Sequence, residues 1–203
     1  MEHNVFSENR RNFLTKVVPL AALGCLGCKR SFAYQLVDDL KSNVSEGLEM
    51  SAEEVYTFFY GMFIPLLKSL ENSIGSIKFN DLITKTSTEN LEKMVSSATK
   101  DIQEKDLKAF ASFMNSALAS PPNNSAFKYE ITEQSDKVLE LKYTQCLPAR
   151  LLRAMNVIDI GLAIECSGAK AAAKGFNPKI GCSNPKNMMK GDSYCIERFT
   201  LNT

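Results

Sequence analysis

Four cysteines near the C-terminus are the side chains of this sequence best suited to chemistry. Cys146, Cys166, Cys182 and Cys195 all lie in the last sixty residues, tryptophan is absent, and the only histidine is His3. A thiolate can attack an electrophilic carbon, but at neutral pH it needs a lowered pKa. The common pairing of cysteine with histidine is absent from this region, so a lysine, an arginine or a helix N-terminus would have to stabilise the anion.

Two other interpretations of the cysteines remain open. Four thiolates could bind zinc, but the spacings contain no Cys-x-x-Cys pair, which makes the zinc signal weak. Buried cysteines also behave as small apolar residues, and an oxidising compartment would permit one or two disulfides. Because the zinc signal is weak, we expect no metal, and we also expect no cofactor.

The first half of the chain, which precedes these cysteines, is predicted to be helical. A short helix is expected over residues 34–50, and Ser51-Ala52-Glu53-Glu54 forms a capping box before apolar residues at helical spacing. Amphipathic helices are expected over residues 87–100 and 106–119. Pro121-Pro122 ends this helical half.

The second half is predicted to mix strands with helices. Residues 127–131 and 139–143 alternate apolar with polar side chains, which indicates a hairpin. The other expected elements are helices over residues 147–155 and 157–174, the latter ended by Gly175, and strands near residues 179–183 and 194–201. Together, these helices and strands predict an α+β fold, in which a helical N-terminal half packs on an antiparallel sheet of about four strands. Because elements adjacent in sequence tend to be adjacent in space, Cys146, Cys166 and Cys195 could converge.

The N-terminus carries an export signature. Arg10 and Arg11 precede an uncharged stretch over residues 17–28, and Ser31-Phe32-Ala33 fits a signal-peptidase site. We expect a twin-arginine signal peptide over residues 1–33 and a single domain over residues 34–203. The twin-arginine export machinery would then be a partner, and the mature protein would be periplasmic.

A lipid anchor is the alternative for this segment. Cys25 or Cys28 could be lipidated, which would tether the domain to a membrane without adding a span. Removing residues 1–33, which hold five basic and two acidic residues, leaves 19 basic and 21 acidic residues. This balance gives no electrostatic footprint for nucleic acid or for an anionic membrane.

Several motifs stand in a recognisable order toward the C-terminus. They are Cys146, Cys166, Asn177-Pro178, Lys186-Asn187-Met188-Met189, Gly191-Asp192, Cys195 and Phe199. In this order the tract resembles the L-2-amino-thiazoline-4-carboxylic acid hydrolase family. The resemblance implies a small-molecule substrate and hydrolytic opening of a cyclic amidine, by attack at the ring carbon between sulfur and nitrogen.

The resemblance also implies roles for individual residues. Cys166 would be the nucleophile, Asp192 the proton carrier, and Cys146 and Cys195 supporting thiols. By residue type alone, Asn177 could orient or polarise a substrate. A cation such as Lys179 or Arg150 would hold the substrate carboxylate.

The sequence also departs from the family pattern. Members usually carry an aspartate two or three residues after the second cysteine, where this chain has Gly168 and Ala169. Cys182 is additional to the pattern. The closing Gly-Asp-x-x-Cys motif bears a fainter similarity to 4-vinyl reductase domains, which are ligand-binding modules. A non-catalytic small-molecule-binding protein, or a redox or disulfide protein of the same fold, is therefore the alternative.

Overall fold

The capping box predicted at Ser51 begins the first helix, α4 (Ala52–Ile74). The Ser51 hydroxyl accepts a hydrogen bond from the Glu54 backbone N–H at 3.3 Å, and the Glu54 carboxylate accepts one from the Ser51 N–H at 2.8 Å. The structure, a computed structural model, describes residues 51–202. The expected signal peptide and the expected helix over residues 34–50 lie outside these residues.

Helix α5 (Ser76–Ala98) begins eleven residues before the start that the sequence predicts. Gly75 separates it from α4 with a φ of +83°, a conformation that glycine adopts at little cost. The start is hard to see in the sequence because no side chain caps it. Instead, Phe79 is completely buried and fixes this first part of α5 by packing.

Two helices and a hairpin follow. The Asp106 carboxylate caps α6 (Leu107–Ala119) by accepting a hydrogen bond from the Ala109 N–H at 2.7 Å. The short α7 (Asn123–Ala126) leads into β1 (Phe127–Gln134), which pairs with β2 (Val138–Cys146). The expected helix over residues 106–119 and the expected hairpin are confirmed.

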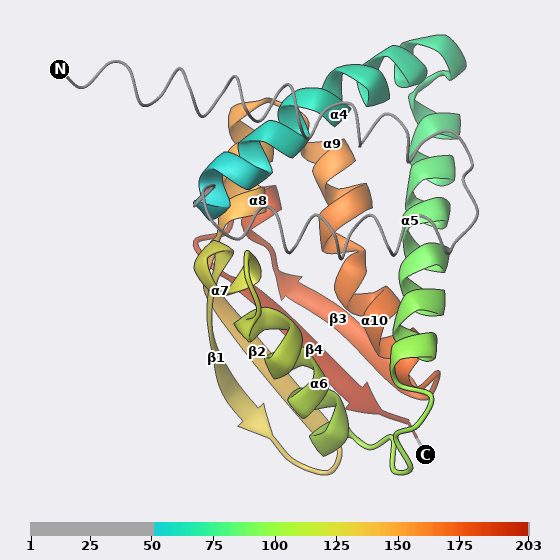
Figure 1. Cartoon of the computed structure of the whole chain (residues 1–203), viewed down its shortest axis with the longest axis vertical. Helices are drawn as coiled ribbons and strands as arrows, with labels where there is room; N and C mark the ends of the chain where they lie inside the picture. The colour runs from blue at the N-terminus through green and yellow to red at the C-terminus, as the bar shows by residue number, and fades with distance from the viewer. Residues whose placement is uncertain (1–50, 203) are drawn as a thin grey trace, which may run out of the picture. The chain divides into compact units, whose positions relative to one another are not determined.

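The chain then returns through helices to complete the sheet. The remaining elements are α8 (Leu147–Ala154), α9 (Ile158–Gly161), the π-helical segment η1 (Leu162–Cys166), α10 (Gly168–Phe176), β3 (Ile180–Lys186), the 3₁₀ turn η2 (Met188–Lys190) and β4 (Cys195–Leu201). The four strands are antiparallel in the order β1-β2-β4-β3, as Figure 1 shows. This confirms the α+β class with a four-stranded antiparallel sheet.

Gly175 does not end its helix, contrary to the expectation. Helix α10 continues to Phe176, with Asn177 as its C-cap. An added Cβ at Gly175 would lie 2.5 Å from the Glu92 carbonyl oxygen of α5. The glycine therefore permits the close backbone approach of α10 to α5.

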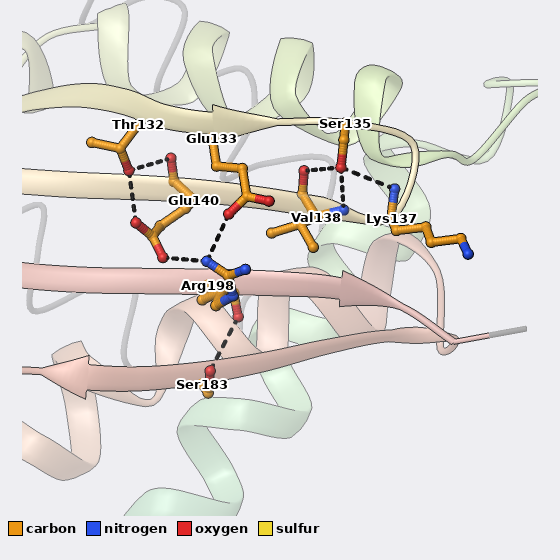
Figure 2. Close-up of polar contacts among 8 residues, drawn as sticks. All are labelled: Thr132, Glu133, Ser135, Lys137, Val138, Glu140, Ser183 and Arg198. Carbon is orange, nitrogen blue, oxygen red and sulfur yellow. Dashed lines mark hydrogen bonds and ion pairs between the residues drawn. The ribbon is translucent and has the colours of Figure 1, made fainter.

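The two faces of the sheet differ in character. On the inner face, Phe199 of β4 and Phe176 of α10 both contact Phe110 of α6, with ring centroids 4.9 and 5.2 Å apart. On the outer face, the Arg198 guanidinium pairs with the Glu140 carboxylate at 2.6 Å and the Glu133 carboxylate at 2.8 Å (Figure 2). Apolar burial thus lies on the helical side of the sheet, and ion pairs lie on the other.

A second apolar cluster joins the helices near the end of β2 and the start of β4. Its buried members come from α4, α5, α8, α9 and the adjoining turns: Tyr60, Ile64, Phe79, Ala149, Leu152, Val157, Ile160 and Met189. Cys146 and Cys166 pack against this cluster, whereas Cys182 and Cys195 pack against the sheet core. The region between the two clusters is where the candidate site lies.

Candidate functional site

Three of the four C-terminal cysteines line one cavity of about 230 Å³. Cys146 is the last residue of β2, Cys166 the last residue of η1, and Cys195 the first residue of β4. The convergence expected from sequence neighbourhood is therefore present. Cys182 lies on β3 outside the lining residues.

Asn187 links two of these cysteines through the turn between β3 and β4. Its buried amide oxygen accepts a hydrogen bond from the Met189 N–H at 2.8 Å and a longer one from the Cys166 thiol at 3.8 Å. The Met188 N–H in turn donates to the Cys195 sulfur at 3.1 Å. One turn thus orients both sulfur atoms toward the cavity that they line.

The thiols hold their protons strongly. Burial raises the pKa of Cys146 to about 12 and that of Cys166 to about 11, and it also raises the pKa of Cys195. The four cysteines that the structure describes carry free thiols. A resting thiolate is therefore disfavoured, and any attack by sulfur needs a base that removes the proton during the reaction.

Two carboxyl groups that the sequence reasoning missed line the same cavity. Glu165 accepts a hydrogen bond from the Tyr60 hydroxyl at 2.8 Å, and Glu197 accepts one from the Tyr143 hydroxyl at 2.9 Å. Burial raises the pKa of Glu165 and brings that of Glu197 to about 7. A carboxyl that titrates near neutral pH is suited to general acid–base catalysis.

Sequence spacing contained a signal for both carboxyls. Glu197 follows Cys195 by two residues on the same strand, so both side chains point to the same face of the sheet. Glu165 immediately precedes Cys166 within the π-helical segment. Such single-turn π segments inside helices often occur at functional sites.

Asp192 lies beside the cavity and not in its lining. Its carboxylate accepts a hydrogen bond from the Asn187 N–H at 2.8 Å and pairs with the Lys186 ammonium at 3.3 Å. The Asn187 N–H holds the pKa of Asp192 below its usual value. In this position the carboxylate orders the turn that holds Asn187.

Asn177 lies away from the three cysteines. Its side-chain amide donates to the Lys105 carbonyl at 2.7 Å, and its oxygen accepts from the Lys179 N–H at 2.9 Å. These bonds fix the end of α10, and Asn177 lines a separate and more open depression. The structure therefore does not bring Asn177 to the site that holds Cys166.

The expected substrate cations also lie elsewhere. Arg150 is exposed and pairs with the Glu53 carboxylate at 2.7 Å, and neither Arg150 nor the exposed Lys179 lines the cavity. None of the lining residues within 51–202 is basic. Gly168 and Ala169, where the family pattern has an aspartate, form part of the cavity wall.

Within residues 51–202, no group of three or more histidine, cysteine, aspartate or glutamate side chains is arranged to hold a metal ion. Among the helices of that range, none combines the length and the apolar character that crossing a membrane requires.

Comparison with known proteins gives one family and one fold-level similarity. The model for the L-2-amino-thiazoline-4-carboxylic acid hydrolase family matches residues 56–199, and no curated protein matches the chain. Among solved structures, a trafficking protein particle complex subunit 3 from Naegleria fowleri, covalently bound to palmitic acid in its crystal, is similar with a TM-score of 0.43 and 13% identity. That similarity covers 74% of this chain and 95% of the other. Since the family match spans most of the chain, this protein belongs to the L-2-amino-thiazoline-4-carboxylic acid hydrolase family.

Proposed function

We propose that this protein hydrolyses a small cyclic amidine of the thiazoline type by cysteine-based chemistry. The observation that carries the proposal is that the Cys166 thiol and the Glu197 carboxyl line one cavity of about 230 Å³. The family is named for a hydrolase of such a compound. The cavity has the size for one small ring and the groups for covalent catalysis.

The first step forms a bond between the Cys166 sulfur and the ring carbon that lies between sulfur and nitrogen. The thiol proton passes to the ionised Glu197, because the raised pKa of Cys166 makes a resting thiolate scarce. Glu197 then returns this proton to the departing ring heteroatom as one ring bond of that carbon breaks. The ring opens, and the carbon remains attached to Cys166.

The second step consumes one water molecule. Glu197 takes a proton from water as the oxygen attacks the same carbon, and the carbon–sulfur bond to Cys166 breaks. The proton then regenerates the thiol, so the net change is the addition of water to the substrate. A carboxyl with a pKa of about 7 can both accept and donate at neutral pH, which this cycle requires.

The other predicted residues have supporting roles in this proposal. Cys146 and Cys195 shape the wall around the reacting carbon. Asp192, which the sequence suggests as the proton carrier, acts as a positioning residue through the Asn187 N–H. Glu197 takes the proton-carrying role because it lines the cavity, as Asp192 does not.

The test is hydrolysis of 2-amino-thiazoline-4-carboxylate and of its carboxylate-free analogue 2-amino-2-thiazoline by the purified full chain. We expect ring-opened product, followed by mass spectrometry, and at least a hundredfold loss of turnover in Cys166→Ser. Cys182→Ser is the matched control, since Cys182 is also partly buried but lies outside the cavity lining. Absence of product from both compounds, or full activity in Cys166→Ser, would refute the proposal.

A non-catalytic binding protein is the second candidate. The observation that favours it is the raised pKa of all three lining thiols, none of which is paired with a cation among the cavity residues described. A binding protein would retain a small molecule without converting it. The same assay separates the candidates, because only the hydrolase gives product that disappears with the Cys166 thiol.

A further inference from the structure

The cavity has an electrostatic character that its proposed substrate must match. Glu165 reaches it from η1 and Glu197 from β4, so two carboxyls approach from different elements. Each is held by one tyrosine hydroxyl, at 2.8 and 2.9 Å, and each retains a second carboxylate oxygen beyond that bond. The rest of the lining is mostly apolar, which strengthens any charge interaction inside it.

A bound anion would be unfavourable in this environment. A substrate carboxylate would face two acidic groups of like sign, and the cations expected to hold it, Arg150 and Lys179, are outside the lining. A cation would be favoured for the complementary reason. Burial raises the pKa of Glu197 to about 7, and a positive ligand nearby would offset the cost of ionising that carboxyl.

An amidinium group has the geometry that fits a carboxylate. It is planar and carries two parallel N–H donors, which can bind both oxygens of one carboxylate as an arginine does. We propose that the cavity selects a cationic amidine without a carboxylate of its own, with Glu197 and Glu165 as the groups that bind the amidinium. This inference rests on the proposed function, because it names the substrate class of the same site.

The test uses three probes of nearly equal shape that are not substrates for ring opening. Benzamidine is a cation, benzamide is neutral and benzoate is an anion. Their binding to the full chain at pH 7.5 can be measured by isothermal titration calorimetry. We expect benzamidine to bind at least tenfold more tightly than benzamide, and benzoate to bind more weakly still. Equal binding of the three probes, preference for benzoate, or no binding of benzamidine would each overturn the inference.

Isosteric variants assign the selectivity to residues. Glu197→Gln and Glu165→Gln should each weaken benzamidine binding at least tenfold while leaving benzamide binding within about twofold. Glu130→Gln is the matched control, because Glu130 is a glutamate of the same sheet that pairs with Lys142 on the surface. A circular dichroism melt confirms that each variant is folded. Unchanged benzamidine affinity in both cavity variants would overturn the assignment.

The inference of cation binding and the proposal of hydrolysis can fail independently of each other. If the thiazoline carboxylate is turned over more efficiently than 2-amino-2-thiazoline, the inference fails and the hydrolase proposal stands. If benzamidine binds through Glu197 but neither thiazoline is opened, the hydrolase proposal fails while cation recognition by the cavity stands.

Discussion

Glu197 is a carboxyl of the cavity whose pKa burial brings to about 7. Its side chain lies on the inner face of the sheet, two residues after Cys195, where burial opposes its negative charge. Nearby, Cys166 and Cys146 keep their protons for the same reason. The cavity therefore holds neutral thiols and a carboxyl balanced near neutral pH.

This balance predicts a pH dependence of stability. The native pKa of about 7 lies above the ordinary value of 4.5, so the folded state binds the Glu197 proton more tightly than the unfolded state does. The free energy of unfolding should thus be highest below pH 4.5 with respect to this group and fall as pH rises to 7, by about 3 kcal/mol. Urea denaturation of the full chain between pH 4.5 and 8 measures the fall.

Glu197→Gln should remove most of that fall, because the amide does not ionise. Glu165, whose pKa burial also raises, contributes with the same sign and leaves a residual slope. Glu130→Gln should retain the full slope of the parent. An identical slope in Glu197→Gln and the parent would show that the carboxyl ionises freely in the folded protein.

The sequence predicted some residues of this site and missed others. The cysteines were found because their residue type is rare and reactive. Glu165 and Glu197 were missed because glutamate is common and usually solvated, and their spacing from Cys166 and Cys195 does not by itself show that they are buried. Asp192 was placed near the correct turn by its motif, but which carboxylate faces the cavity depends on strand pairing.

At the scale of elements, the contact of α10 with α5 positions the wall that follows Cys166. Gly175 permits this contact, since an added Cβ would lie 2.5 Å from the Glu92 carbonyl oxygen. Gly175→Ala should therefore separate the two helices and lower the free energy of unfolding by about 1–3 kcal/mol. Chemical denaturation measures the loss.

Gly61→Ala is the matched control for this substitution. Gly61 lies inside α4 with nothing within 4 Å of an added Cβ, so alanine should stabilise the helix by about 0.5–1 kcal/mol. The two alanine substitutions should thus act in opposite directions. If both stabilise the protein, close approach is not what requires glycine at Gly175.

Element prediction succeeded where the pattern is local. The hairpin of β1 and β2 follows from alternation, and α6 from its capping Asp106 and apolar stripe. The start of α5 was missed because it depends on burial of Phe79 by residues far along the chain. The insertion of β4 between β2 and β3 is equally nonlocal and has no sequence signature of its own.

At the scale of the whole molecule, the fold class and the family follow from the sequence, while the cellular location of the mature protein remains a prediction. We propose export by the twin-arginine route, on the basis of Arg10, Arg11 and the site at Ala33. In a bacterial host with this route, the mature protein should begin at Tyr34 by N-terminal sequencing and appear in the periplasmic fraction.

Variants of the signal provide the control. Arg10→Lys combined with Arg11→Lys should retain the precursor in the cytoplasm, whereas Arg30→Lys, outside the pair, should be exported normally. A mature N-terminus at a lipid-modified Cys25 or Cys28 would contradict cleavage after Ala33 and indicate a membrane-tethered protein instead.

The π-helical segment Leu162–Cys166 makes the cavity sensitive to chain length as well as to residue type. A π turn holds one more residue than an α turn, so the residues that follow are rotated by about 100° relative to an uninterrupted α-helix. A relative of the same length that formed a regular α-helix here could share every cysteine and glutamate of this chain. It would nevertheless turn Gly168 and Ala169 out of the wall, so the presence of the π turn is a better guide to shared specificity than sequence identity.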